Sequence, residues 1–277
     1  MTSKKRFPQA AGDRVPPAAG GSFQDPYAIF AGVYDEFMEH VPYRAWASYL
    51  SRRYQSITRT TAAAVTDLAC GTGQLLAQFP RRIQRAGMDG SAAMLDQARQ
   101  RLPGVVLEQG RLEERLPFAS ESQSHVVCTH DSLNYVTEPT ALQNHFADVQ
   151  RVLKAGGLYS IDIVSLANIL NNFDNQTLEH RSRACRLVWK NSYDPKTRLM
   201  RSDLEFFMKG RGAVGSGSGG PSHVERHLQR YYSIDEIRKM AAEAGLETVL
   251  IEGDYEPRPH RRGDNFWNLH LRKSPRG

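Results

Sequence analysis

The stretch Val65-Thr-Asp67-Leu-Ala69-Cys-Gly71-Thr-Gly73-Gln74 decides the fold of this chain. A short apolar run over 62–68 predicts a buried strand, and a helical pattern over 74–79 follows it directly. Glycines suit the turn between them, because positive φ angles and close approach of a ligand exclude a side chain. On its own, this turn leaves both a nucleotide-binding site and a purely structural turn open.

Outward from this turn, short apolar runs alternate with longer helical patterns. Such alternation is typical of βαβ units, whose strands form a parallel sheet. Further along, polar-alternating stretches predict antiparallel strands, and Ser233 with Glu236 predicts a capping box that opens a late helix. The expected strands are 86–88, 105–107, 125–128, 158–164, 183–193, 199–208, 246–251 and 265–271, and the expected helices include 91–102 and 140–154.

The predicted fold class is α/β, with a Rossmann-like, seven-stranded, mostly parallel sheet and helices on both faces. An antiparallel β insertion and an N-terminal helical lid are expected in addition. The segments are a disordered tail rich in Pro, Gly and Ala (1–22), a lid with aromatic residues at helical spacing (23–56), a cofactor-binding core (57–164), an insertion covering the substrate (165–232), and a final helix with closing strands (233–277).

Composition and charge exclude several classes of protein. The formal net charge of +6 gathers in residues 1–22 and 254–277, which leaves the rest near neutral and disfavours nucleic acid as a partner. No apolar run approaches the roughly 20 residues of a membrane span. Cys70, Cys128 and Cys185 show neither paired nor metal-ligand spacing, so we expect free thiols, no metal and a cytoplasmic location. Monomer and homodimer both remain open.

A second motif, Gly87-Met-Asp89-Gly-Ser91, ends the next predicted strand. An acidic side chain roughly 20 residues after the glycine turn is placed to accept hydrogen bonds from both hydroxyls of a ribose. The structural alternative is that this Asp-Gly-Ser sequence only turns the chain and caps a helix through Ser91. Leu76 stands where a dinucleotide site has a third glycine, which argues against NAD.

Four motifs in order resemble the class I methyltransferases that depend on S-adenosylmethionine (SAM). They are Asp67-x-Ala-Cys-Gly-Thr-Gly73, Gly87-x-Asp89-x-Ser91, Leu116-Pro-Phe118 and Leu153-Lys-Ala-Gly-Gly157. Within about 27–273, the aromatic N-terminal segment and Asp131-Ser-Leu-Asn-Tyr135 are most similar to the small-molecule branch. The resemblance implies methyl transfer from SAM, leaving S-adenosylhomocysteine, to a nitrogen or oxygen of a metabolite, for example in specialised biosynthesis.

The resemblance also implies which residues bind the cofactor. Asp89 would hold the ribose, and Arg111 departs from the acidic residue that usually binds the adenine amino group at its position. The expected contacts are Asp67, Ala69, Gly71 and Gly73 around the amino-acid half, Gly90, Met94, Arg111 and Leu112 near the adenine, and Tyr27, Tyr34, Trp46, Thr129 and His130 beside them.

Methyl transfer from a sulfonium is an in-line displacement of a leaving group that its own positive charge activates. The protein mainly aligns donor and acceptor, and a base is needed only if the acceptor must lose a proton early. Thr129, His130 and Asp131 follow the strand 125–128, at the sheet edge where ligands bind. His130 is therefore the expected base, with Asp131 or Tyr34 behind it, and the alternative is that His130 only contacts SAM or the loop.

Two other functions are compatible with these motifs. The basic ends of the chain would serve an RNA methyltransferase as phosphate anchors, but an Asn-Pro-Pro-Tyr motif for flipped bases does not occur in the sequence. The other alternative is a noncatalytic partner protein that keeps the SAM fold.

Overall fold

A computed structural model of the protein describes residues 27–182, 185–208 and 220–274. The tail expected over 1–22 and nearly all of the Gly-Ser run over 212–220 lie outside the described residues. No helix in the described ranges is long and apolar enough to cross a membrane. Cys70, Cys128 and Cys185 are buried and free.

The central sheet has eight strands in the order β11-β10-β12-β5-β4-β1-β2-β3. The strands from β3 to β5 are parallel, whereas β12 runs antiparallel to both β5 and β10. Their bounds are β1 (Ala64–Leu68), β2 (Gln84–Asp89), β3 (Val106–Gln109), β4 (Gln123–Cys128), β5 (Leu153–Val164), β10 (Leu246–Gly253), β11 (Glu256–Pro259) and β12 (Phe266–Lys273).

The α/β fold predicted from the sequence is confirmed, but its strand count of seven is wrong. The eighth strand, β11, carries Pro257 and Pro259 and pairs only with β10 at the edge of the sheet. Proline lacks the N–H that a central strand needs, yet it is tolerated in an edge strand. The two prolines, which are typical of a loop, are therefore compatible with an edge strand at this position.

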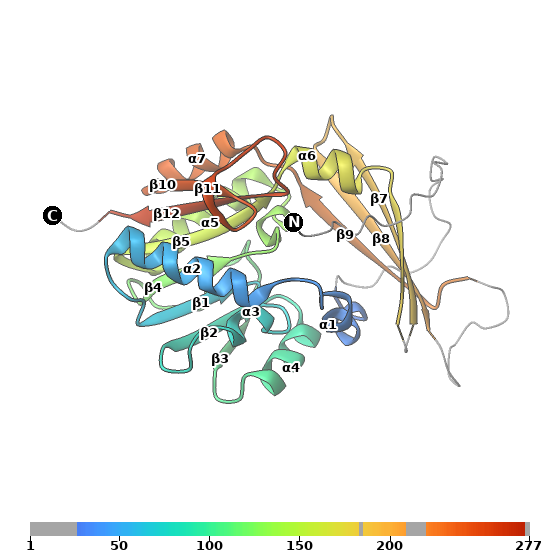
Figure 1. Ribbon diagram of the computed structural model, residues 1–277, viewed down its shortest axis with the longest axis horizontal. Helices are drawn as coiled ribbons and strands as arrows, with labels where there is room; N and C mark the ends of the chain where they lie inside the picture. The colour runs from blue at the N-terminus through green and yellow to red at the C-terminus, as the bar shows by residue number, and fades with distance from the viewer. Residues whose placement is uncertain (1–26, 183–184, 209–219, 275–277) are drawn as a thin grey trace.

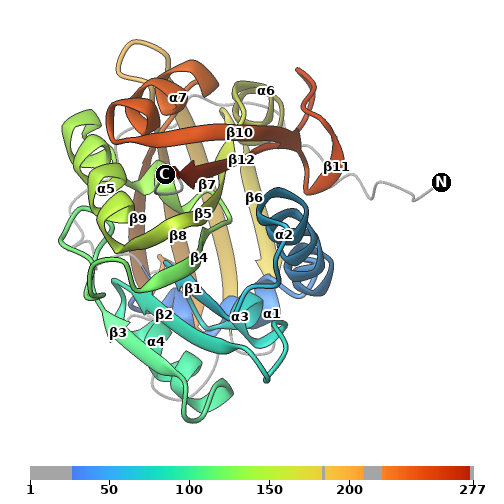
Figure 2. The same cartoon turned by 90° about the vertical axis from the view of Figure 1, so that its left-hand side faces the viewer.

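Helices cover both faces of this sheet (Figure 2). On one face lie α5 (Pro139–Val152) and α7 (Ile234–Glu243), and the predicted Ser233–Glu236 capping box opens α7. On the other lie α2 (Tyr43–Thr58) and α3 (Gln74–Ala77), while α4 (Ala92–Arg101) packs beside β2 and β3. Two apolar cores result, one on each face of the sheet.

A second, antiparallel sheet stands beyond the carboxyl ends of the parallel strands (Figure 1). Its strands, in order, are β6 (Thr177–Arg181), β7 (Cys185–Asp194), β8 (Leu199–Met208) and β9 (His223–Arg230). The expected strands over 183–193 and 199–208 correspond to β7 and β8, whereas β6 and β9 were not expected. Short helices α6 (Leu166–Asn168) and η3 (Ile169–Phe173) lead into this sheet from β5.

The N-terminal segment expected as a lid divides into two parts. The short helices η1 (Phe30–Gly32) and α1 (Tyr34–Phe37) lie between the sheets, where Phe30 packs with Leu204 and Phe206 of β8. By contrast, α2 buries Trp46, Tyr49 and Leu50 against the central sheet. Only the part before α2 is therefore placed to cover a site between the two sheets.

Candidate active site

A cavity of about 800 Å³ lies at the carboxyl ends of β1, β2 and β4 and continues beneath the second sheet. This is the edge of an open α/β sheet at which ligands bind. Three parts of the chain form its walls: the central sheet, the short N-terminal helices, and β7 to β9.

The glycine turn after β1 forms the floor of this cavity. Gly71 has a φ of 55°, and a Cβ built on it would meet nothing within 4 Å, so this backbone faces open space. Gly73 has a φ of 78°, and a Cβ there would lie 2.7 Å from the Leu102 side chain. The first glycine therefore leaves room for a ligand, and the second allows close packing against the end of α4.

Asp89, at the end of β2, holds this turn in place. Its carboxylate accepts the N–H groups of Gly71 and Ser91, both at 2.8 Å, and the residue is only 8% exposed. The Ser91 side chain in turn accepts the N–H of Met94 and caps α4. Asp89 thus turns the chain, and because a carboxylate oxygen has two lone pairs, it can also accept ribose hydroxyls from the cavity.

A second buried carboxylate, Asp67, ends β1 and also lines the cavity. Burial raises its pKa well above the ordinary value, and the negative charge of Asp89 raises it further. Two neighbouring buried carboxylates favour a cationic ligand, since a positive charge would offset their repulsion. SAM carries a sulfonium and an ammonium group, so Asp67, Asp89 and the open Gly71 backbone fit this cofactor.

The residues expected near the adenine lie after β2, on α4 and after β3. Met94 and Leu112 are buried cavity residues, whereas the Arg111 side chain is 68% exposed beside Glu113. Gln109, which sequence reasoning missed, also lines the cavity and donates to the Gly90 carbonyl at 3.3 Å. The sequence signal that could have identified Gln109 is its position at the carboxyl end of a parallel strand.

The turn after β4 brings Thr129, His130 and Asp131 to the cavity. His130 and Asp131 have φ angles of 61° and 50°, a left-handed conformation that costs free energy for residues with a side chain. The Asp162 carboxylate on β5 offsets this cost by accepting both backbone N–H groups, at 2.7 and 2.6 Å. Asp162 is fully buried and was not identified from the sequence.

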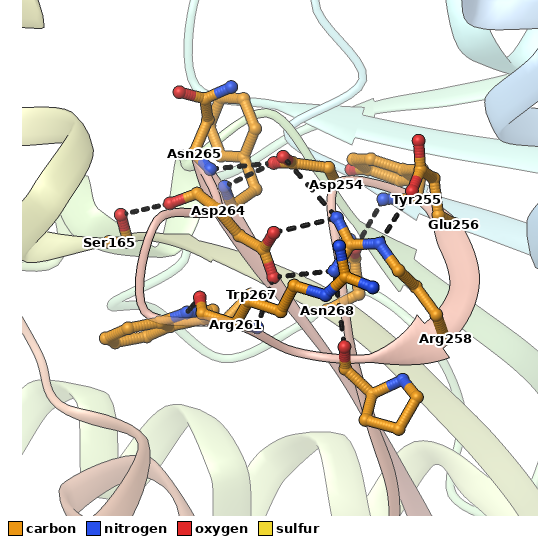
Figure 3. A network of polar contacts seen from close by, with 12 residues as sticks. Ser165, Asp254, Tyr255, Glu256, Arg258, Arg261, Asp264, Asn265, Trp267 and Asn268 are labelled. Atoms are coloured by element: carbon orange, nitrogen blue, oxygen red, sulfur yellow. Dashed lines mark hydrogen bonds and ion pairs between the residues drawn. The ribbon is translucent and has the colours of Figure 1, made fainter.

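Tyr255 completes this arrangement from the hairpin between β10 and β11. Its hydroxyl donates to Asp162, and its ring stacks on Trp46 with centroids 4.0 Å apart. Figure 3 shows the polar network around the hairpin, in which Arg258 binds Asp264 and Glu256. Trp46, expected at the cofactor, is therefore not among the cavity-lining residues and packs behind His130.

The electrostatics of the turn differ from those of an ordinary base. Burial lowers the pKa of His130 to about 4, because the ring lies among Tyr43, Trp46 and Phe266. Burial and then the charge of Asp162 raise the pKa of Asp131 to about 8. At neutral pH His130 is thus a neutral and weak proton acceptor, which favours the contact role over the base role.

The acceptor side of the cavity lies between the two sheets. Tyr27 and Tyr34 from the N-terminal segment face Tyr135 of η2 (Ser132–Tyr135) and His227 of β9. Other cavity residues on this side are Phe173, Trp189, Ser202, Leu204 and Gln229. Tyr135 stands in a stretch that the sequence had marked, but nothing in the sequence pointed to β9.

Within the described part of the chain, no group of three or more His, Cys, Asp or Glu side chains could hold a metal ion.

Known methyltransferases are similar to this chain in sequence. Residues 65–157 match the family model of the methyltransferase domain. Putative methyltransferase YqeM of Bacillus subtilis is 27% identical over 233 residues, which cover 83% of this chain and 90% of that protein. A dTDP-3-amino-3,4,6-trideoxy-alpha-D-glucopyranose N,N-dimethyltransferase of Streptomyces venezuelae is 33% identical over 136 residues, covering 48% of this chain and 56% of that protein.

Solved structures share the fold. A SAM-dependent methyltransferase from Clostridium acetobutylicum superposes with a TM-score of 0.75 at 20% identity, over 90% of this chain and 99% of that one. The sugar N-methyltransferase KedS8 from Streptoalloteichus superposes with a TM-score of 0.70 at 18% identity, over 95% of this chain and 100% of that one. Residues 65–157 therefore match a methyltransferase domain, and the chain around them shares the fold of SAM-dependent methyltransferases.

Proposed function

We propose that this protein transfers the methyl group of SAM to an amino nitrogen of a small-molecule metabolite, with amino sugars as the substrate class. The observation that carries the proposal is the cavity, which runs from the Asp67–Asp89 floor into a compartment walled by both sheets and the N-terminal helices. The cofactor, if held as the sequence predicts, would present its methyl group to that compartment.

The size of the cavity supports a small acceptor. About 800 Å³ is within the range of small-molecule sites, and both SAM and the acceptor must share it. Trp189 lines the acceptor side, and its buried indole N–H has no hydrogen-bond partner within the described ranges. A sugar hydroxyl or ring oxygen would satisfy this donor, since an unpaired buried N–H is costly.

The aromatic rings around the acceptor side support an amine over a hydroxyl. Asp131 lies in its wall, and the rings of Tyr27, Tyr34 and Trp189 offer π faces to an ammonium group. The Streptomyces venezuelae relative is named an N,N-dimethyltransferase of an amino sugar nucleotide, and KedS8 is titled a sugar N-methyltransferase. These names add an analogy at the level of fold and family.

Methyl transfer from labelled SAM to matched acceptors tests the proposal. The panel holds dTDP-3-amino-sugars, the same nucleotides with a 3-hydroxyl, and unmodified tRNA. We expect label in the amino-sugars only. The Asp235→Ala variant, changed at a carboxylate 92% exposed on α7, should retain this activity.

Each remaining outcome favours an alternative. SAM binding by calorimetry without transfer to any small molecule would indicate a noncatalytic partner protein. Label in tRNA, with binding that weakens steeply as salt rises, would favour the RNA methyltransferase.

A further inference from the structure

Four side chains form a continuous hydrogen-bonded chain from the cavity into β9. The Tyr27 hydroxyl donates to the Tyr135 hydroxyl at 2.8 Å, and the Tyr135 oxygen lies 2.9 Å from Nδ1 of His227. Nε2 of His227 lies 3.3 Å from the Glu225 carboxylate. Tyr27, Tyr135 and His227 line the cavity, whereas Glu225 is fully buried.

The direction of these hydrogen bonds follows from Glu225. Its carboxylate already accepts the backbone N–H groups of Tyr27 at 3.0 Å, of Phe30 at 2.9 Å and of Ile29, so Glu225 acts as an acceptor. Nε2 of His227 must therefore carry the proton that faces Glu225, which leaves Nδ1 as an acceptor. Tyr135 donates its single proton to Nδ1, so its oxygen accepts from Tyr27, and every hydroxyl donates toward His227.

His227 is the member of this chain whose ring nitrogen offers a lone pair that can take up a proton. Burial raises the pKa of the Tyr27 and Tyr135 hydroxyls well above the ordinary value of a tyrosine, so both remain neutral. Each tyrosine can accept a proton while it donates its own, but neither is stable as a phenolate. A proton taken up at Nδ1 of His227 would place an imidazolium 3.3 Å from the buried Glu225 carboxylate, its opposite charge.

We propose that His227, through Tyr135 and Tyr27, accepts the proton that an ammonium substrate must lose before methylation, and that Glu225 stabilises the resulting imidazolium. This inference rests on the proposed amine methylation. His227 and Glu225 are positioning residues, because the proton reaches His227 only through the tyrosines that face the substrate and Glu225 acts through His227.

Proton transfer precedes methyl transfer. The ammonium N–H bond breaks toward the Tyr27 oxygen while Tyr27 gives its proton to Tyr135 and Tyr135 gives its own to Nδ1 of His227. The freed nitrogen lone pair then forms the N–C bond to the methyl group, and the pair of the broken S–C bond stays on sulfur. After the products leave, the proton returns along the same chain to water in the cavity.

The charged and titratable groups that face His227 come from three elements. Glu225 lies on its own strand, Tyr135 on η2, and Tyr27 on the N-terminal segment, with the centroids of the Tyr27 and His227 rings 4.8 Å apart. Asp131 is near enough to raise the pKa of Tyr135. At neutral pH none of these groups competes with His227 for the first proton, since the tyrosines are neutral and burial raises the pKa of Asp131 to about 8.

The kinetic test compares wild type with His227→Asn over a range of pH. The Asn oxygen can still accept from Tyr135 but cannot take up a proton. At pH 7 we expect kcat with an amino-sugar to fall about 100-fold, a typical contribution of a positioned base. The defect should shrink as pH rises above the pKa of the amine, because the substrate then binds without the proton. Tyr135→Phe should show the same pattern.

The matched control is His270→Asn. His270 is also a buried histidine bonded to a tyrosine, Tyr49, but it lies outside the cavity. His270→Asn should change kcat by the same factor at every pH. If His227→Asn also lowers kcat by a factor that does not change with pH, the proposed proton transfer is overturned, whereas the proposed amine methylation is not.

A second readout requires no methyl acceptor. In protein labelled with ¹⁵N-histidine and saturated with S-adenosylhomocysteine, the His227 signals are those missing from the His227→Asn spectrum. We expect the neutral tautomer with hydrogen on Nε2, and hydrogen on Nδ1 would overturn the proposed direction even in an active enzyme. If wild type methylates no amine, the proposed function fails, and this inference fails with it.

Discussion

Asp89 illustrates how one side chain can serve both the fold and the ligand. Its two oxygens fix the Gly71 and Ser91 backbone, and its burial raises its pKa while these two N–H groups lower it. A carboxylate so held is already oriented before SAM binds. SAM binding therefore does not have to supply the free energy needed to orient this carboxylate.

Replacing Asp89 by alanine should therefore weaken SAM binding by on the order of 2 kcal/mol, or about 30-fold, because charge-assisted hydrogen bonds to the ribose are lost. Isothermal calorimetry measures this directly. Asp96→Ala is the matched control, since Asp96 is exposed on α4 and pairs only with Arg99 in the described structure. Unchanged affinity in Asp89→Ala would mean that the ribose binds elsewhere.

His130 should act through contact and not as a base. With its pKa lowered to about 4, it is neutral throughout the physiological range and changes charge only in acid. We expect His130→Ala to reduce SAM affinity and turnover by similar factors, several-fold each, without altering the pH profile near neutrality. A much larger loss of kcat than of affinity, measured by steady-state kinetics and calorimetry, would restore the base role.

At the scale of elements, Asp162 joins three pieces that are remote in sequence. It lies on β5, binds the turn after β4 through two N–H groups, and accepts the hydroxyl of Tyr255 from the β10–β11 hairpin. The hairpin itself has little freedom, because a Cβ on Gly253 would collide with the Asp264 carboxylate. The left-handed turn at His130 and Asp131 is therefore stabilised, through Asp162, by the β10–β11 hairpin at the edge of the sheet.

Tyr255→Phe should lower the free energy of unfolding by about 1 kcal/mol, the usual net value of one hydrogen bond, and Asp162→Ala by about 3 kcal/mol or more. The second value is larger because the N–H groups of His130 and Asp131 lose their acceptor together with the Tyr255 hydroxyl. Urea denaturation measures both, with Tyr193→Phe on β7 as a control away from this network. Equal effects of the two variants would show that Asp162 does not hold the turn.

The elements that sequence reasoning identified are those whose signals are local. Parallel strands read as apolar runs, and the glycine turn and Asp89 stand within 30 residues of each other. The strand β9 escaped because its inward side chains, Glu225, His227 and Gln229, are polar, so no apolar alternation marks it. Tyr135 and His227 meet across 92 positions, a contact that only the assembled sheets create.

On the scale of the whole molecule, the N-terminal segment fastens the two sheets together. Glu225 on β9 accepts backbone N–H groups from the start of this segment. A few residues later, Asp35 accepts the Thr72 hydroxyl at 2.6 Å and pairs with Arg101, next to the glycine turn. The same short segment thus closes the cavity over the expected cofactor site and completes the proton chain at Tyr27.

A buried polar network also joins α2 to the central sheet. His125 contacts Ser160, which contacts His270, and His270 contacts the Tyr49 hydroxyl of α2 at 3.0 Å. Tyr49 then donates to Glu252 at 2.7 Å. Burial lowers the pKa of both histidines to about 3, so the folded protein keeps them neutral.

This network predicts a loss of stability in acid. Between the ordinary histidine pKa of 6.5 and about 3, the unfolded chain binds protons that the folded chain does not, so these histidines lower the unfolding free energy as pH falls. Asp131 and Asp162 act oppositely, since burial raises their pKa to about 8 and about 6 and the folded chain then holds the extra protons. Comparing the unfolding free energies of variants as pH falls separates the effect of the histidines from that of the aspartates.

His270→Asn should be less stable than wild type at about pH 7, because it disrupts the contacts to Tyr49 and Ser160. The gap should narrow by up to about 1.4 kcal/mol for each pH unit below the ordinary histidine pKa, since only wild type still loses stability through this group. Urea denaturation from about pH 7 to about pH 5 measures the gap, with the exposed His260→Asn as a control whose gap should stay constant. A constant gap for His270→Asn would mean that His270 is protonated in the folded protein, and the network would then have to accommodate a buried charge.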